Sequence, residues 1–390
     1  MKNRIISAAF ILIIFVFGAA TALKSVRGVV SDVREYGLDS DTPGRIESEI
    51  QDKIYKKYYW IDIHGLTQRA LGRTVVDGSG SNVYKLKSGS ITGLGKYISD
   101  EELADYADNV RLVRDSIPED VDLIYVQLPY KIGSDEELPP GVSSPAASTE
   151  DGLVEQLRER DIETVDIRSL IREEGLDWPS LFYVTDHHWR PQTACWTADR
   201  ISRYLADNHG YRYDASLYDE KNMKTETFKN LFLGSVGRRT GVFYAGIDDF
   251  ELVTPAYETS FDFTSYPGDT VIHREGDFRE ALIDDGNLKK DYYHINNYAA
   301  YTGDSTKTTT TINHDPLNDK KILLVRDSYS CALQPFLSLS QKEITTIDLR
   351  YFKEDTVIDY INSHDFDTVI IAYSSTAFDT ERFAFDEIVE

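Results

Sequence analysis

Lys321-Ile-Leu-Leu-Val-Arg-Asp-Ser-Tyr-Ser330 is the segment from which a fold can be built outward. Its first half is a short apolar run, which is typical of a strand buried on both faces of a parallel sheet. We expect the strand to end near Val325 and a helix to begin about Tyr329. Ser328 then lies on a strand-to-helix turn, at the sheet edge where ligands of α/β proteins bind. Taken alone, the segment favours the simpler interpretation that Ser328 only caps the helix.

Four further apolar runs resemble this strand, and helical patterns separate them. The expected strands cover residues 123–128, 163–167, 344–349 and 368–372. The expected helices cover residues 153–160, 192–205, 330–339 and 354–361. Such alternation predicts an α/β fold, with a doubly wound, mostly parallel sheet and helices on both faces.

Residues 206–312 interrupt this alternation, because they are rich in Tyr, Asp, Gly and Thr. We expect them to form an irregular or antiparallel insertion. Residues 305–312, mostly threonine, are predicted to form a strand because β-branched residues favour strands.

A second segment, Thr185-Asp-His-His-Trp-Arg-Pro191, supplies an acid and a base. Pro191 suits the first turn of a helix and keeps the residues before it out of helical geometry. We therefore expect Asp186 and His188 in an extended segment, with their side chains on the same side. An aspartate beside a histidine can fix the histidine tautomer and stabilise the imidazolium. Together with Ser328 they form the set that acyl transfer needs, which requires the Ser328 oxygen within about 4 Å of a His188 ring nitrogen.

A metal site is the alternative use of His187 and His188. In an extended segment adjacent histidines face opposite ways, which disfavours one shared ion. The other six histidines show no ligand spacing. We therefore expect neither a metal nor a cofactor, and we interpret His187 as a spacer and Trp189 as a packing residue or a wall of the substrate site.

The N-terminus predicts export. Residues 5–23 are apolar and uncharged, and 19 such residues are long enough to span a bilayer. Lys2 and Arg4 precede them, so the positive-inside rule keeps residues 1–4 in the cytoplasm and places the rest outside. The alternative is a cleaved signal sequence, because small residues occupy positions 19–22. The protein is therefore expected to be a single-pass membrane protein with an extracytoplasmic domain, or a secreted protein if the segment is cleaved.

The remaining chain is expected to divide into two parts. Residues 24–55 are charged and are predicted to be a juxtamembrane connector, with some helix around 45–58. Residues 56–390 are predicted to be the catalytic domain, whose folded body begins near Trp60. Its length suits one large domain or two ordinary domains.

The net charge limits the classes of binding partner, and the cysteine content limits the kinds of structural site. A net charge of −24 argues against nucleic acid and anionic lipid as partners, whereas a neutral glycan stays compatible. Two cysteines, Cys195 and Cys331, exclude a disulfide scaffold and a zinc finger. They are expected to be small buried residues; the alternative is a disulfide between two motif-bearing helices.

The two motifs together resemble the paired signatures of the bacterial DHHW protein family, which is similar to the SGNH-hydrolase-like proteins that O-acetylate alginate and other exopolysaccharides. Weaker matches extend the resemblance over residues 55–380. They are Trp60-Ile-Asp-Ile-His-Gly65, Leu71-Gly-Arg73, Leu128-Pro-Tyr-Lys131, Leu233-Gly-Ser235, Asn297-Tyr-Ala-Ala-Tyr-Thr-Gly303, Pro335-Phe-Leu337 and Asp348-Leu-Arg-Tyr351.

The resemblance implies an SGNH-hydrolase-like fold in which Ser328 is the nucleophile, His188 the general base and Asp186 its partner. Arg326 stands where the family motif often begins with glycine, so the oxyanion side of the turn departs from the pattern. The candidate oxyanion or substrate-binding residues are Tyr329, Arg326, Trp189, Tyr301 and Gly303. The implied partners are a polysaccharide acceptor and a multi-spanning membrane O-acyltransferase that delivers acetyl groups.

The sequence therefore predicts an extracytoplasmic serine acyltransferase that O-acetylates a cell-surface or secreted polysaccharide. Two alternatives stay open. If water replaces the sugar hydroxyl as acceptor, the same three residues make a carbohydrate acetylesterase. A non-catalytic, membrane-anchored glycan-binding or assembly protein would keep the fold without the chemistry.

Overall fold

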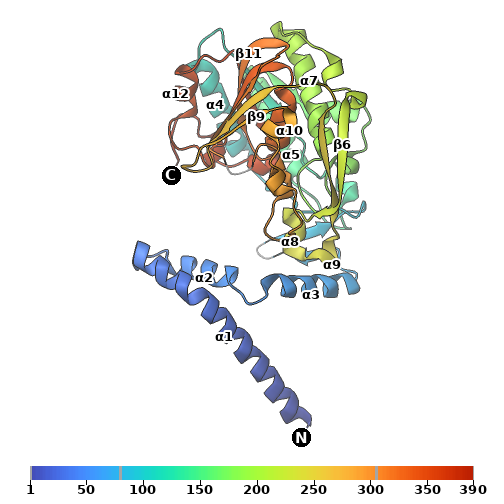
Figure 1. The fold of residues 1–390 in the computed structure, drawn as a ribbon, viewed down its shortest axis with the longest axis vertical. Helices are drawn as coiled ribbons and strands as arrows, with labels where there is room; N and C mark the ends of the chain where they lie inside the picture. Colours follow the sequence, from blue (N-terminus) through green and yellow to red (C-terminus); the bar gives the residue numbers. More distant parts are fainter. Residues whose placement is uncertain (1, 79–80, 304–305, 390) are drawn as a thin grey trace.

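A computed structural model describes residues 2–78, 81–303 and 306–389 of the chain. Its centre is an eight-stranded sheet in the order β5-β4-β13-β11-β12-β10-β8-β9 (Figure 1). The first five of these strands are parallel, and the last three run antiparallel along one edge. The parallel strands are β4 (Asp122–Gln127), β5 (Thr164–Asp166), β11 (Asn318–Arg326), β12 (Gln341–Ile347) and β13 (Thr368–Tyr373). They coincide with the five strands predicted from the sequence.

The apolar run of β11 is continuous because both faces of the strand are buried. Ile322 and Leu324 belong to the core on one face of the sheet, and Leu323 and Val325 to the core on the other. The helices of the first face are α6 (Ile167–Glu173), α7 (Pro191–His209) and α11 (Ser330–Leu337). Those of the second face are α4 (Asp100–Ser116), α5 (Ala146–Glu159) and α12 (Val357–Asn362). The predicted doubly wound α/β fold is confirmed.

The interruption at residues 206–312 is antiparallel, as predicted, but much of it belongs to the central sheet. The strands β8 (Phe261–Ser265) and β9 (Ile272–Gly276) join that sheet through β10 (Thr308–Asn313). Residue 305 of the predicted strand lies outside the described residues. The other elements of this region are β6 (Met223–Phe232), α8 (Ser235–Thr240), α9 (Val242–Ala245), β7 (Asp248–Pro255) and α10 (Phe278–Leu282). A small separate sheet is formed by β1 (Val75–Asp77), β2 (Asn82–Lys85) and β3 (Ile91–Thr92).

The N-terminal region is more helical than predicted. A single helix, α1 (Lys2–Tyr36), contains the apolar stretch and continues through the first part of the predicted connector. It ends where Gly37 adopts a positive φ of 74°, a common way to end a helix. By length and composition α1 is apolar enough to cross a membrane, a test that a signal sequence also passes.

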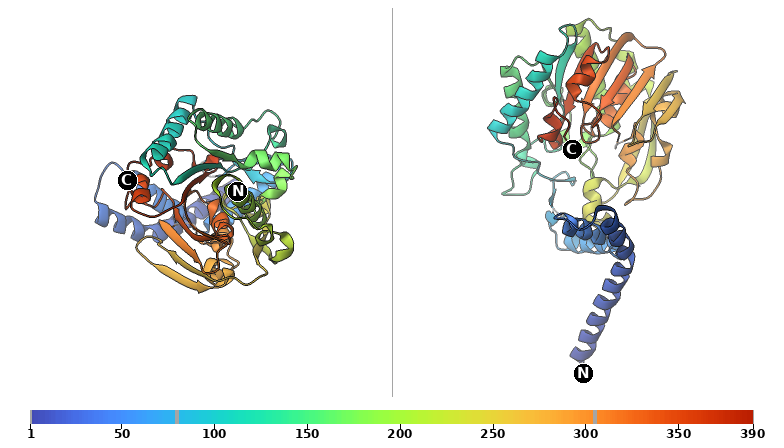
Figure 2. Two further views of the ribbon diagram at one scale, coloured as in Figure 1. Left: turned by 90° about the horizontal axis from the view of Figure 1, so that it is seen from above. Right: turned by 90° about the vertical axis from the view of Figure 1, so that its left-hand side faces the viewer.

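Two further helices connect α1 to the body. The helix α2 (Thr42–Asp52) folds back against α1, and α3 (Lys57–Ala70) lies along the base of the body (Figures 1 and 2). The division of the chain into tail, anchor, connector and catalytic domain stays a prediction.

Candidate active site

The turn after β11 is held by a buried aspartate. Asp327 accepts hydrogen bonds from the Tyr329 N–H at 3.0 Å and from the N–H and hydroxyl of Ser374 at 2.8 and 2.7 Å. Ser374 directly follows β13, so the neighbouring strand fixes the turn. Burial raises the pKa of Asp327, although the Ser374 bonds oppose this. The turn leaves Ser328 partly exposed between two buried residues.

The structure brings the three predicted residues together. The Nε2 atom of His188 lies 2.7 Å from the Ser328 hydroxyl oxygen, and its Nδ1 atom lies 2.5 Å from an Asp186 carboxylate oxygen. Both distances are those of hydrogen bonds. The distance between His188 and Ser328 is well within the limit of about 4 Å that we expected for these two residues. A continuous relay from acid to base to hydroxyl therefore exists before any substrate binds.

The segment that carries Asp186 and His188 bends sharply, so the predicted extended geometry is wrong. The same Asp186 oxygen that meets the His188 ring also accepts the His188 backbone N–H at 2.9 Å. An aspartate that bonds to the amide two residues on turns the chain, which competes with extended structure. As a result the rings of His187 and His188 lie side by side, with centroids 3.9 Å apart, instead of facing opposite ways.

Aromatic rings fix the plane of the His188 imidazole. One face packs on His187, and the other stacks on Tyr298 with centroids 4.0 Å apart and an interplanar angle of 12°. The Nδ1 atom of His187 lies 3.0 Å from the Ser235 hydroxyl, which holds that ring in turn. His187 is therefore more than the spacer predicted from the sequence, and Tyr298 is a supporting residue that the prediction missed.

The metal alternative must be reconsidered on this geometry. Ligand atoms of Asp186, His187 and His188 all lie within 4.8 Å of one another, so the predicted argument against a shared ion does not hold. The atoms concerned are already engaged, however. Both His188 nitrogens bond to Asp186 and Ser328, and His187 Nδ1 bonds to Ser235. The chain uses this donor set for hydrogen bonding.

The charges of the site follow from its burial. Burial alone would raise the pKa of Asp186, but the adjacent His188 and His187 and the hydrogen bonds from His188 hold that pKa well below its usual range. Burial and the neighbouring His188 lower the pKa of His187 to about 3, so this ring is neutral near pH 7. An ionised Asp186 next to His188 suits the stabilisation of an imidazolium at His188.

We expect His187→Ala to lower the catalytic rate about tenfold. The variant removes one of the two rings that hold His188 but leaves both His188 hydrogen bonds intact. Because the neutral His187 supplies no charge, the pH profile of the rate should stay unchanged. Steady-state kinetics across pH 5–9 measure both effects; a loss as large as that of His188→Ala would show that His187 itself takes part in proton transfer.

Two buried, oppositely charged residues hold the same loop. The Lys131 ammonium nitrogen lies 2.6–3.0 Å from the carbonyl oxygens of Ile91, Tyr183, Val184 and Asp186, which share its three N–H groups. Asp248 accepts the backbone N–H groups of Val184 and Thr185, at 2.9 and 2.7 Å, and the Thr185 hydroxyl at 2.7 Å. Asp248 thus binds the N–H groups of the loop and Lys131 binds its carbonyl oxygens, so both kinds of backbone group are held. Lys131 belongs to a motif of the resemblance, whereas no sequence signal marks Asp248.

Gly234 allows a close backbone approach to the acid. A Cβ atom at this position would lie 2.2 Å from the Cβ atom of Asp186, which is not sterically possible. The approach lets the Ser235 N–H donate to the second Asp186 oxygen at 2.5 Å. This contact explains why the Leu233-Gly-Ser235 motif accompanies the other two.

Several predicted oxyanion or substrate-binding residues are buried and hold the site from behind. Trp189 has no exposed surface, and its indole N–H donates to the Tyr329 carbonyl at 3.1 Å. The Tyr301 hydroxyl bonds to the Val253 backbone inside the core. Arg326 is also buried and reaches Thr306 at 2.8 Å and Asp348 at 3.5 Å. The side chains of these three are packed inside the protein, which agrees with the packing role predicted for Trp189, and contact of any of them with a substrate stays a prediction.

The amides of the first α11 turn are also occupied. The Tyr329 N–H donates to Asp327, and the Cys331 N–H to the Ser328 carbonyl at 3.2 Å. In this structure the Tyr329 N–H is therefore engaged by Asp327, and an oxyanion role for Tyr329 stays a prediction. Gly303, with a φ of 84°, is partly exposed and follows Thr302, whose hydroxyl bonds to the Cys331 carbonyl at 3.0 Å. Gly303 stays a candidate for substrate contact.

In the described part of the chain both cysteines are buried and neither forms a disulfide, which agrees with the simpler prediction of two small buried residues. Burial raises the pKa of Cys195 to about 12. The alternative of a disulfide between α7 and α11 is not realised in this structure.

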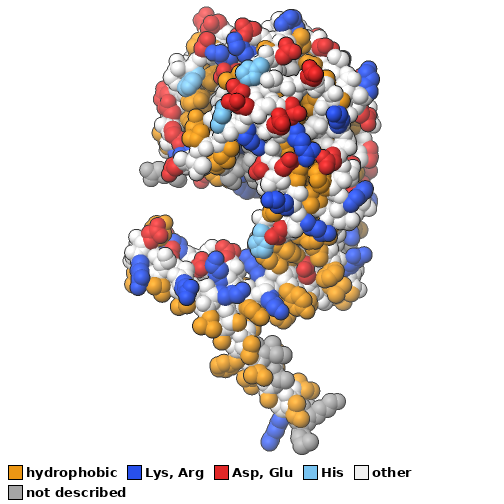
Figure 3. Space-filling model, in the orientation of Figure 1, with side chains coloured by type: hydrophobic (Ala, Val, Ile, Leu, Met, Phe, Trp, Pro, Cys, Tyr) orange, Lys and Arg blue, Asp and Glu red, His pale blue; other side chains and the backbone are white. Residues whose placement is uncertain are grey.

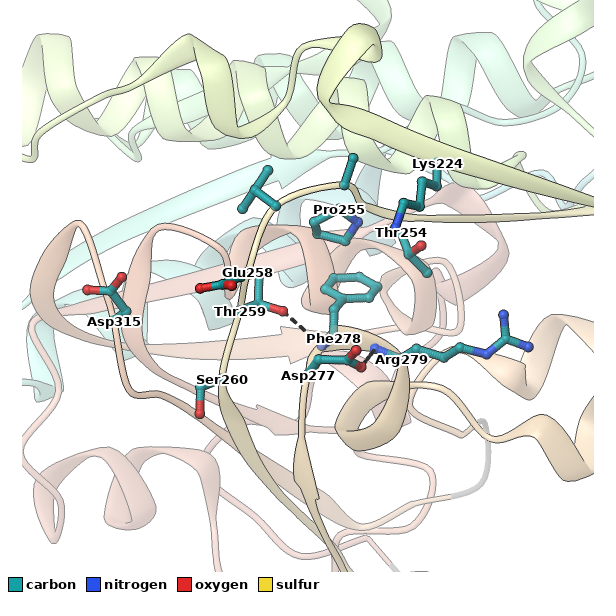
Figure 4. A pocket seen from close by; sticks show the side chains of 12 residues that line it. Lys224, Thr254, Pro255, Glu258, Thr259, Ser260, Asp277, Phe278, Arg279 and Asp315 are labelled. Carbon is teal, nitrogen blue, oxygen red and sulfur yellow. Dashed lines mark hydrogen bonds between the residues drawn. The ribbon is translucent and has the colours of Figure 1, made fainter.

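A hollow of about 700 Å³ lies between β7, β8 and α10 (Figure 4). Its polar groups cap α10: the Thr259 hydroxyl accepts the Phe278 N–H, and the Asp277 carboxylate accepts the Arg279 N–H, both at 2.9 Å. None of the three relay residues lines it. The relay residues and this hollow are therefore separate.

Residues 96–241 match the family model described as "SGNH hydrolase-like domain, acetyltransferase AlgX". Over these residues the chain is similar to SGNH hydrolase-like domains. The match confirms the predicted resemblance and the predicted class of enzyme, that of the SGNH-like O-acetyltransferases. It includes Asp186 and His188 and stops before Ser328. No curated protein sequence matches the chain.

Solved structures share the fold. PatB1 of Bacillus cereus, solved with a sulfonyl adduct, has a TM-score of 0.66 at 15% identity, and the alignment covers 80% of this chain and 99% of that one. A DHHW family protein from Eubacterium siraeum has a TM-score of 0.61 at 18% identity, with 82% and 99% of the chains covered. At these identities the likeness concerns the fold of the SGNH-like domain.

Proposed function

We propose that this chain is an extracytoplasmic O-acetyltransferase that acts on a polysaccharide through Ser328, His188 and Asp186. The observation that carries the proposal is the hydrogen-bonded relay from Asp186 through His188 to a partly exposed serine hydroxyl. The family match over residues 96–241 supports the acetyl group as the group transferred.

The first half-reaction moves the acetyl group to the enzyme. The Ser328 oxygen attacks the carbonyl carbon of an acetyl donor while its proton passes to His188 Nε2. The bond from that carbon to the leaving group then breaks, and the leaving group takes the proton from His188. Acetyl-Ser328 and a protonated leaving group result. Asp186 keeps His188 Nδ1 protonated and stabilises the positive charge of the imidazolium.

The second half-reaction regenerates the enzyme. A sugar hydroxyl attacks acetyl-Ser328, its proton passes to His188, and the proton returns to the Ser328 oxygen as the acetyl ester leaves on the sugar. Water in place of the sugar hydroxyl would give an acetylesterase, so the outcome depends on the acceptor site excluding water. A multi-spanning membrane O-acyltransferase is the proposed source of acetyl groups, since α1 would hold this protein at the same membrane.

The experiment supplies an isotopically labelled acetyl donor, such as an aryl acetate, with and without a neutral polysaccharide. Transfer predicts labelled ester on the polysaccharide and a faster turnover of donor when the acceptor is present. Free acetate at a rate independent of acceptor would identify an esterase. If the protein binds polysaccharide without turnover of the donor, and the Ser328→Ala variant binds it equally well, the protein is a glycan-binding protein and not an enzyme.

A further inference from the structure

The helix α3 carries its apolar side chains on the outside. Tyr59, Trp60, Ile63 and Leu66 recur at helical spacing and are between 38% and 59% exposed. Leu71, just past the helix, and Phe243 of the adjacent α9 extend this surface. Figure 3 shows hydrophobic side chains along the underside of the body at this level. We call these six residues the α3 platform.

A different face of α3 is the one that contacts the body. Asp62 accepts hydrogen bonds from the Val242 N–H at 2.9 Å and from the Tyr293 hydroxyl at 2.5 Å. A Cβ atom on Gly65 would lie 2.1 Å from the Thr240 carbonyl oxygen, so the helix packs tightly against the end of α8. A surface helix of a soluble protein turns its apolar stripe inward, and α3 does the reverse. Its exposed stripe therefore indicates an apolar partner outside the body.

The platform begins where the apolar part of α1 ends. The Trp60 ring contacts the Phe17 ring of α1, with centroids 5.8 Å apart, and the Tyr55 N–H donates to the Thr21 hydroxyl at 3.1 Å. Phe17 lies six residues before the end of the apolar stretch, which is about 9 Å along a helix. This depth matches that of interfacial helices, whose apolar face lies about 5–10 Å into the bilayer surface.

The charges around α3 also suit a lipid surface. Residues 53–73 contain five basic residues and one acidic residue, a local charge of +4 in a chain of −24. Tryptophan and tyrosine, both present in the platform, are the residues that concentrate at membrane interfaces. The acidic body disfavours anionic lipid, whereas this segment attracts it.

We propose that the α3 platform lies in the surface of the lipid bilayer that α1 enters, and holds the body in one orientation on it. The inference rests on the proposed export and anchoring. It places the candidate site near the membrane, because α8 connects the two: its first residue, Ser235, contacts Asp186, and its last, Thr240, contacts α3. Six helical residues and the width of α3 together span about 20 Å. Acetyl groups delivered at the membrane then need to travel about this far to reach Asp186, at the near end of the relay.

The test reconstitutes the full chain into phosphatidylcholine–phosphatidylglycerol vesicles with brominated acyl chains, which quench nearby tryptophans. Trp60 adjoins α1, so a tether alone would bring it near lipid; the decisive reporter is Leu66→Trp in a Trp60→Phe background. We expect strong quenching at position 66, comparable to that of native Trp60. The matched control reporter, Ile272→Trp on the exposed β9 of the body, should show none.

Absence of quenching at position 66 overturns the proposal. Because the vesicles contain no other protein, this result would indicate that the α3 platform binds a membrane protein and not lipid. Equal quenching at positions 66 and 272 also overturns it, because the body would then have no fixed orientation. A second variant combines Ile63→Glu and Leu66→Glu with a Leu71→Trp reporter. Its tryptophan at position 71 should be quenched at most half as strongly as in a protein that carries Leu71→Trp without the two glutamates. The readout needs no catalysis, so failure here is distinct from failure of the proposed reaction.

Discussion

Ser328→Ala is expected to reduce acetyl transfer by about 10⁴-fold or more, with the fold intact. The variant removes the oxygen that would carry the acetyl group, and no other group of the relay can form that ester. Because Ser328 is partly exposed and its hydroxyl bonds to His188 alone among the residues that the structure describes, loss of the hydroxyl should cost about 1 kcal/mol of stability or less. Rates of ester formation on the polysaccharide and a denaturation curve measure the two effects.

Ser330→Ala is the matched control for this variant. Ser330 lies two residues away at the start of α11, is fully buried, and its hydroxyl has no hydrogen-bond partner among the residues that the structure describes. Its removal should leave the rate within about twofold. A sulfonyl fluoride should modify Ser328 in the wild type and leave Ser328→Ala unmodified, as read by mass spectrometry of peptides. Retention of more than a tenth of the activity by Ser328→Ala would exclude it as the nucleophile.

Much of the fold was predictable because its core strands are parallel. A strand such as β11 is buried on both faces, so it leaves a short, continuous apolar run that the sequence displays directly. The helix α3 was harder to predict. Its apolar stripe faces outward and its contacts to the body run through Asp62 and Gly65, so the usual rule of an inward apolar face does not locate the start of the body.

The relay residues were predictable because each is marked locally. Ser328 sits at a strand-to-helix junction, and Asp186 and His188 precede a proline that begins a helix. The shape of their loop was not predictable. It depends on Lys131 and Asp248, more than 50 residues away on either side, and such pairing across the chain leaves no periodic signal in one sequence.

The backbone amides around Ser328 are a second feature that could not be predicted from the sequence. A helix start normally offers free N–H groups, which led to the expectation of an oxyanion site at Tyr329. The side chain of Asp327 takes this amide, and it is held in place by Ser374 from another strand. A contact between two strands far apart in the sequence therefore decides which donors remain for a substrate.

Lys131→Met is expected to cost about 3–5 kcal/mol of folding free energy, the range for breaking a buried charged network. Methionine keeps the volume but donates nothing. Four buried carbonyl oxygens would lose their shared donor, and Asp248 would lose a nearby positive charge. The same change frees the backbone at Asp186, so the catalytic rate should fall about 10²-fold even where the variant stays folded.

Chemical denaturation in detergent micelles measures the stability, and kinetics at low denaturant measure the rate. Lys320→Met is the matched control. Lys320 is half-buried, with 40% of its side chain exposed, and pairs with Asp367 at 2.7 Å near the surface, so its loss should change stability by about 1 kcal/mol or less. Equal effects of the two variants would show that the four carbonyl contacts of Lys131 do not hold the loop.

The cost of Lys131→Met should also depend on pH. Burial lowers the pKa of Lys131 to about 7 from an ordinary 10.5, although Asp248 and Asp186 act in the opposite direction. Between these two values the unfolded chain holds a proton that the folded protein lacks, so wild-type stability rises with pH in this window. The variant has no such group. The difference in unfolding free energy between wild type and variant should therefore be constant below pH 7 and widen from pH 7 toward 10, as urea titrations at pH 6, 8 and 9.5 would show. A difference that stays constant over this range would mean that the contacts to the carbonyl oxygens and the two carboxylates offset the effect of burial, so that the pKa of Lys131 is not lowered in the folded protein.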